Sequence, residues 1–140
     1  MSDYLENKFI DALLRGQAFP SIPTLFVALF TANPTDAGGG TECTGGSYAR
    51  VSYAASLANF SGTQAAASTT VSTGTSGQST NNAAITFPVL TAAWGTITGV
   101  ALFDAATAGN MLVWATVPAK TPSSGDTVAF AAGQMSWTAA

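Results

Sequence analysis

The sequence predicts an all-β protein, a sandwich or barrel of about eight strands that follows one N-terminal helix. Three observations carry this prediction. Apolar side chains recur at helical spacing only in residues 1–16. The later apolar segments are short and rich in valine, phenylalanine and threonine, and glycine, proline or asparagine separates them. Short strands between turn residues at such spacing are typical of sandwiches and barrels.

Residues 1–16 form the predicted helix. Its apolar stripe consists of Leu5, Phe9 and Leu13 at four-residue spacing, with Ile10 and Leu14 beside them. Such spacing places side chains on one face of a helix with 3.6 residues per turn. Ser2 or Asp3 can cap the first turn, and Gly16 is a natural end because glycine accepts the left-handed conformation. Five of the eleven charged residues lie in this segment, so the helix also has a polar face.

The first half of the remaining chain alternates a clear strand with irregular segments. Pro20 and Pro23 favour an extended approach, and residues 24–31 (TLFVALFT) are a strongly apolar strand candidate. Residues 32–47 read as one long glycine-rich loop, which is usually functional or mobile at this length. Strand character returns in residues 48–54. The Ser/Thr/Ala-rich stretch that follows, to residue 82, predicts one or two weak strands and a flexible turn, or else disorder.

The second half has a regular rhythm of strands and turns. The strand candidates are residues 84–88, 96–104, 111–117, 126–130 and 134–138. The candidate at 111–117 (MLVWATV) is apolar on both faces, as expected for a strand at the centre of a packed sandwich or under a partner chain. With 140 residues the chain fits a single domain, namely the helix at 1–16 and a sandwich over 17–140 that carries the loop 32–47.

The composition favours contact with other proteins over contact with nucleic acid or membrane. Charged residues make up 8% of the chain, against about 25% in an average soluble domain. Interface cores are depleted of charge because desolvating an ion is costly. Four scattered cations do not make a phosphate-binding footprint. The longest strongly apolar run, residues 25–30, is far shorter than a membrane span, and no signal peptide is visible, so we expect synthesis in the cytosol.

Catalytic chemistry is sparse. The chain has no histidine, which excludes Ser–His and Cys–His arrangements, and Cys43 is its single cysteine. Asp36 and Glu42 share the long loop and could in principle bind calcium, but no EF-hand spacing is present. A glycosidase pair of Asp104 and Asp126 is the remaining enzymatic alternative, although both read as turn residues. We therefore expect no enzyme, no metal, no cofactor and no small-molecule substrate.

Three tryptophans could stack on sugar rings, as in a carbohydrate-binding module. Trp114 lies inside a strand candidate and is expected in the core. Trp94 precedes Gly95 in a turn, and the sequence favours its exposure.

Several segments together resemble a family of small tailed-bacteriophage virion proteins. They are LFVALFTANPTDAGGGTE at residues 25–42, GGSYAR at 45–50, ALFDAATAGNMLVWATV at 101–117 and PAKTPSSGDTVAFAAGQM at 118–135. The resemblance covers most of the chain except roughly residues 54–82. Members are often loosely labelled tail-fibre proteins. The length and organisation are also similar to capsid cement (decoration) proteins with a jelly-roll fold, which implies a jelly-roll-like sandwich here.

The resemblance implies a structural virion protein on the capsid exterior, which binds the major capsid protein and stabilises the mature shell. The alternative is a tail-fibre or tail-tip component that binds a host receptor. Self-association is expected as a homodimer, with a trimer as the alternative. The expected capsid or subunit contacts are Leu5, Phe9 and Leu13 in the helix, Phe19, Pro20 and Pro23 in the approach, and Asn33, Pro34, Asp36 and Glu42 in the loop. The helix stripe could instead cover the sandwich's own core.

Overall fold

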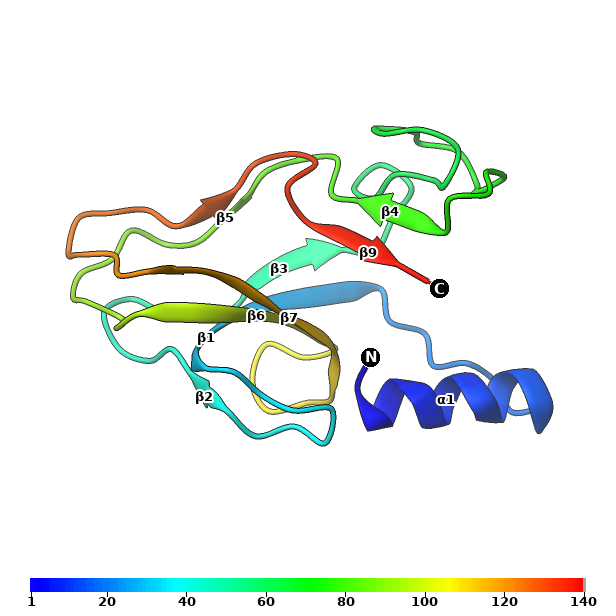
Figure 1. The fold of residues 1–140 in the computed structure, drawn as a ribbon, viewed down its shortest axis with the longest axis horizontal. Helices are drawn as coiled ribbons and strands as arrows, with labels where there is room; N and C mark the ends of the chain where they lie inside the picture. Colours follow the sequence, from blue (N-terminus) through cyan, green and yellow to red (C-terminus); the bar gives the residue numbers. More distant parts are fainter. Residues whose placement is uncertain (140) are drawn as a thin grey trace.

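The computed structural model describes residues 1–139 and has one helix followed by nine strands (Figure 1). The helix α1 spans Asp3–Leu14. The strands are β1 (Thr24–Ala32), β2 (Thr41–Glu42), β3 (Val51–Ala54), β4 (Gln78–Thr80), β5 (Ile85–Thr86), β6 (Ile97–Phe103), β7 (Met111–Lys120), β8 (Ala129–Phe130) and β9 (Ser136–Thr138). The prediction of an all-β fold with one N-terminal helix is confirmed.

The main layer is a five-stranded antiparallel sheet with the order β2-β1-β6-β7, in which β3 also pairs with β1. β3 pairs with the first half of β1 (Leu25 opposite Tyr53), and β2 pairs with its end (Phe30 opposite Glu42). β6 pairs with β1 through Phe26–Phe103 and Ala28–Ala101. Two small ribbons, β4-β9 and β5-β8, form the facing layer, so the sheets make a sandwich.

The central strands β1 and β6 are buried on both faces. Val27 and Leu29 point into the core between the two layers, and Ala28 and Phe30 belong to a second apolar group on the opposite face. β6 divides in the same way, because successive side chains of a strand point to opposite sides. This explains why these segments are continuously apolar rather than alternating. The core between the layers also holds Ile85, Phe87, Leu90, Trp94 and Met135.

The segment 32–47, predicted as one loop, contains the short strand β2. Its backbone returns to the edge of β1, and the Cys43 N–H donates to the Leu29 carbonyl at 2.9 Å. Cys43 is consequently buried in the core rather than placed in an open loop. At Gly40, where φ is +78°, an added Cβ would meet the Ala32 carbonyl oxygen, so this glycine permits the close return.

Other sequence predictions need correction in detail. β7 is longer than predicted, and it is the edge strand of the sheet rather than its centre. Trp94 is 4% exposed and donates its indole N–H to the Gly46 carbonyl at 2.9 Å, so the prediction that it is exposed is wrong. Trp114 is half-buried against the second apolar group. The segment 54–82 contains one strand, β4, within irregular chain.

Candidate interaction surface

The helix is attached to the body mainly through its N-terminus. The Ser2 N–H donates to the Leu112 carbonyl at 2.9 Å, and the Asp3 N–H donates to the Asp36 carbonyl at 3.0 Å. The Ser2 hydroxyl donates to the Met111 carbonyl and also accepts from the Leu5 N–H, which makes Ser2 the N-cap. This buried serine thus fixes both the start of the helix and the direction in which the helix leaves the sheet.

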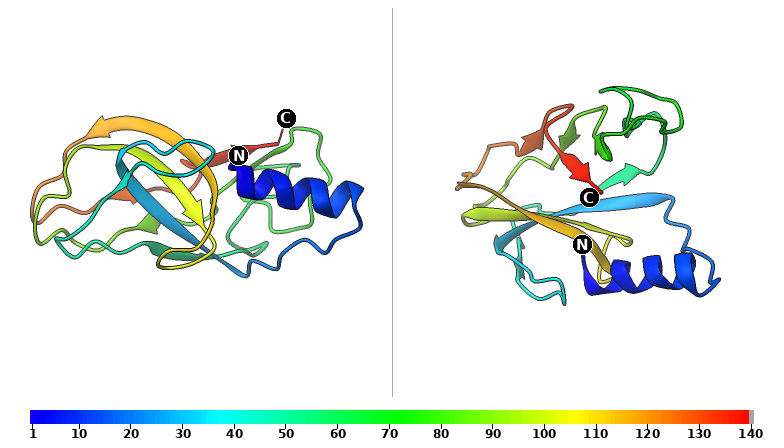
Figure 2. Two further views of the ribbon diagram at one scale, coloured as in Figure 1. Left: turned by 90° about the horizontal axis from the view of Figure 1, so that it is seen from below. Right: turned by 45° about the vertical axis from the view of Figure 1, so that its right-hand side comes forward.

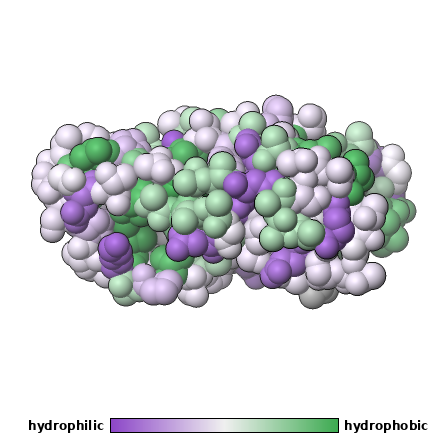
Figure 3. All heavy atoms as spheres, turned by 90° about the horizontal axis from the view of Figure 1, so that it is seen from above, coloured by the Kyte–Doolittle hydropathy of each residue, from purple (hydrophilic) through white to green (hydrophobic). Residues whose placement is uncertain are grey.

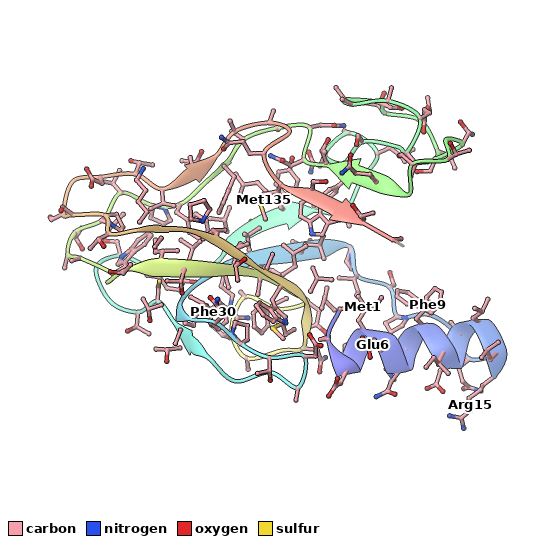
Figure 4. All side chains as sticks on the ribbon, in the orientation of Figure 1. Met1, Glu6, Phe9, Arg15, Phe30 and Met135 are labelled. Atoms are coloured by element: carbon pink, nitrogen blue, oxygen red, sulfur yellow. The ribbon has the colours of Figure 1, made fainter. Side chains whose placement is uncertain are left out.

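Beyond this attachment the helix projects from the sandwich (Figure 2). None of its twelve residues is buried. Figure 4 places Phe9 on the projecting part and Arg15 at its far end, away from Phe30 and Met135 in the body. A 12-residue helix without tertiary packing is marginal in water. We call this projecting helix the helix arm. Contact with another molecule would stabilise it.

The large apolar residues of the projecting part are exposed. They are Phe9, Ile10, Leu13 and Leu14 on the helix and Phe19 in the segment that leads back to β1, and we call this set the arm patch. Leu13 is 66% exposed and Leu14 is 74% exposed. The sequence predicted the stripe, and the structure shows that its outer part does not cover the protein's own core.

An apolar groove lies beside the root of the arm, between α1, β7, β9 and the segment after β3. Leu5, Leu25, Leu57, Phe60, Val113 and Trp137 supply its main apolar surface, and none of the side chains that line it is charged. The groove has a volume of about 590 Å³. Val113 and Trp137 also line a second hollow of about 290 Å³ along β7, so the sandwich is open on this side.

The predicted contact residues divide into two sets. Leu5, Phe9, Leu13 and Phe19 lie on the arm or beside the groove, with Pro20 half-buried and Pro23 exposed in the returning segment. The loop residues make contacts within the fold, and among them Asp36 lies at the root of the arm, where its carbonyl accepts from the Asp3 N–H. Pro34 is buried, and Asn33 accepts a hydrogen bond from the Thr98 hydroxyl at 3.0 Å. Asp36 is exposed, but its carboxylate accepts the indole N–H of Trp114 at 3.0 Å.

Glu42 belongs to an internal ion pair that the sequence analysis missed. Both of its carboxylate oxygens accept from the Arg50 guanidinium at 2.8–2.9 Å. Arg50 also donates to the carbonyls of Ala105 and Ala108 and stacks on the Phe103 ring at 3.7 Å from its centre. This arginine connects β2 to the 104–110 turn, so its charge is paired inside the fold. The sequence feature that could have predicted this ion pair is the isolated arginine in YAR, within a chain of few charges.

Cys43, Asp104 and Asp126 are each held by contacts within the fold. Burial, with the adjacent Glu42 carboxylate as a smaller cause, raises the pKa of Cys43 to about 11, so its thiol stays protonated at neutral pH. Asp104 and Asp126 each accept hydrogen bonds from their own turns, as predicted. Among residues 1–139 no three metal-binding side chains come close enough to hold an ion.

One face of the molecule is weakly polar. Figure 3 shows that most residues there are near neutral in hydropathy, with strongly hydrophilic and strongly hydrophobic residues in small groups among them. Within residues 1–139 we find no helix with the length and hydropathy that crossing a membrane requires.

An all-β body that carries an exposed apolar arm is suited to contact with other chains. The comparison with known families agrees with such a role. Residues 1–138 match the family described as podophage GP4 fiber I protein gp80, and the chain belongs to that family. It is therefore a structural protein of a phage virion. A search of curated proteins found no match.

Proposed function

We propose that this chain is a structural subunit of a phage tail fibre and that the helix arm is its principal contact element. The observation that carries the proposal is the arm patch, which belongs to a chain of a fibre family. Large apolar side chains that gather on a projecting element favour burial against another chain, at roughly 25 cal/mol for each Å² removed from water.

The proposed role is non-enzymatic binding. The charged side chains nearest the loop are engaged in the fold, as with Glu42 and Arg50. The chain has no histidine, and the thiol of Cys43 is buried and protonated. Two surfaces are suited to binding another protein, because the arm patch and the groove are both apolar and free of charge.

Capsid cement remains the second candidate, and the projecting arm is the observation that favours it. An arm that extends from a compact body can reach across the joint between two major capsid subunits and stabilise the mature shell by binding only that state. In this case the protein would lie on the capsid exterior with the major capsid protein as its partner. The remaining predicted contacts, Pro20, Pro23 and Asp36, would then flank the arm or lie at its root.

The copy number and location of the protein in purified virions decide between the two roles. Virions are separated into heads and tails, and the protein is quantified against the major capsid protein in each fraction. A fibre subunit is expected with the tails, at a few per cent of the major capsid protein. A ratio near one to one in the head fraction would instead establish cement, and absence from virions would overturn both.

A further inference from the structure

The projecting arm and the apolar groove have complementary properties, although each lies on the same chain. Four of the five large apolar side chains of the arm patch lie within less than two turns of the helix. The groove presents an uncharged apolar lining of about 590 Å³. A helix whose apolar face enters an apolar groove is a common mode of protein recognition.

The total surface of the chain is consistent with one missing contact. Its accessible surface is 7514 Å². A compact monomer of 14.1 kDa is expected to expose about 6,700 Å². The excess of roughly 800 Å² equals one partner's share of a standard protein interface. The arm and the open groove are the features that a compact monomer would lack.

Charge also permits contact between two copies. The groove lining has no ionisable side chain, so docking an apolar helix there leaves no unpaired charge buried. Of the five charged residues of the arm, Asp11 and Arg15 pair with each other at 2.8 Å, and the other three, Asp3, Glu6 and Lys8, precede the arm patch in the sequence. The formal net charge of −3 for 140 residues produces little repulsion between copies.

We infer that the arm patch of one copy docks into the apolar groove of a second copy of the same chain, with Leu13 and Leu14 packing against Leu57, Phe60 and Trp137. The inference deepens the proposed function by naming the partner of the arm, and it rests on that function's choice of the arm as the contact element. A contact between two different surfaces joins copies head to tail, which gives reciprocal dimers, rings or filaments.

Sedimentation of the full-length chain tests the contact with two variants. Leu13→Glu disables the arm and leaves the groove intact, whereas Leu57→Glu disables the groove and leaves the arm intact. Leu57 is 50% exposed at the groove, so both substitutions are compatible with folding. Val89→Glu is the matched control, because Val89 is similarly exposed but lies neither on the arm nor in the groove. Circular dichroism verifies that each variant is folded.

The expected result is that the unmodified chain and Val89→Glu associate at micromolar concentration while each of the other variants alone is monomeric. Mixing Leu13→Glu with Leu57→Glu should restore a one-to-one dimer, because one intact arm then meets one intact groove. Pairing of arm against arm would instead leave Leu57→Glu associating normally, which overturns the inference. So would an unmodified chain that stays monomeric up to roughly 100 μM, well above the range expected for a standard interface.

Disulfide trapping supplies a second measurement. Leu13→Cys in one population and Leu57→Cys in another should form a mixed dimer on oxidation, whereas neither population alone should. Cys43 is buried and does not compete. Failure of the mixed dimer in a population that still associates would contradict arm-in-groove docking. These solution results are independent of where the protein lies in the virion, so they can fail while the fibre assignment stands.

Discussion

The central strands of the body and the helix arm contain the same kinds of apolar residue but bury them very differently. Val27 and Leu29 in β1 are completely buried, whereas Leu13 and Leu14 in α1 are mostly exposed. The body buries its apolar side chains internally, on both faces of β1 and β6. The apolar side chains of the arm are exposed, so the favourable free energy of burying them is gained only when another chain covers them. The difference separates the residues that stabilise the fold from those available for assembly.

The largest effect expected on stability comes from the centre of the body. Leu29→Ala should lower the free energy of unfolding by about 3–5 kcal/mol, because it leaves a cavity between two packed layers. Urea denaturation at low protein concentration, where association does not contribute, measures this change. A loss below about 1 kcal/mol would contradict the assignment of Leu29 to a tightly packed core.

The Arg50–Glu42 pair should rank next. Arg50→Ala is expected to cost about 3 kcal/mol, because it removes the cation that pairs with the half-buried Glu42 carboxylate, leaves that carboxylate with the Tyr48 hydroxyl as donor, and takes the Arg50 donor from two carbonyls. Arg15→Ala is the matched control. Its pair with Asp11 lies on the arm, where the arginine side chain is 71% exposed, so its loss should change stability by at most about 0.5 kcal/mol. Equal losses of unfolding free energy in the two variants would contradict the difference between the ion pair of the body and that of the arm.

Alkaline pH should lower the free energy of unfolding of the body. The pKa of Cys43 is raised from 9.0 to about 11 in the folded chain. Between these values the unfolded thiol loses its proton and the folded one keeps it, so stability falls as pH rises from about 9 to 11. Burial raises the pKa of Tyr48 as well, which extends the loss to higher pH. Unfolding curves at pH 8 and pH 10.5 should differ less in Cys43→Ala, and an unchanged difference would contradict the assigned cause.

The smallest effect is expected in the arm itself. Leu14→Ala should change the free energy of unfolding of the dilute monomer by no more than about 0.5 kcal/mol, because its side chain contacts mainly water. The same leucine-to-alanine change at Leu29 is its counterpart in the body, so the pair isolates burial as the variable. Comparable destabilisation by both changes would mean that the arm packs on the body.

The sequence was informative where a pattern is local. The apolar run of β1, the N-cap at Ser2 and the stop at Gly16, where φ is +68°, follow from residues within a few positions of each other. β6 was predicted within one residue of its ends for the same reason. The arm stripe was predicted as well, but periodicity does not tell whether a stripe faces its own core or solvent.

The sequence was uninformative where long-range contacts decide. β2 has only two residues and exists because its backbone meets the edge of β1. Trp94 is buried because it packs against Tyr48 and Phe87 in the core, where the distant Gly46 carbonyl accepts its indole N–H. The apolar pattern of β7 suggested a central strand or one under a partner chain. The strand instead lies at the edge of the sheet, where the Ser2 N–H donates to the Leu112 carbonyl, and its side chains line the second hollow. Such pairings depend on the course of the chain over tens of residues, which composition and spacing do not encode.

The most direct test of the arm as the contact element is the incorporation of arm variants into virions. A phage that lacks the gene is supplied with the protein in trans, either unmodified, as Leu13→Glu/Leu14→Glu, or as the control Val89→Glu, and copies per virion are counted by quantitative mass spectrometry. We expect the control to be incorporated normally and the copy number of the folded double variant to fall by at least about tenfold, the equivalent of 1.4 kcal/mol. Normal incorporation of the double variant would contradict the proposal that the arm binds this protein into the particle.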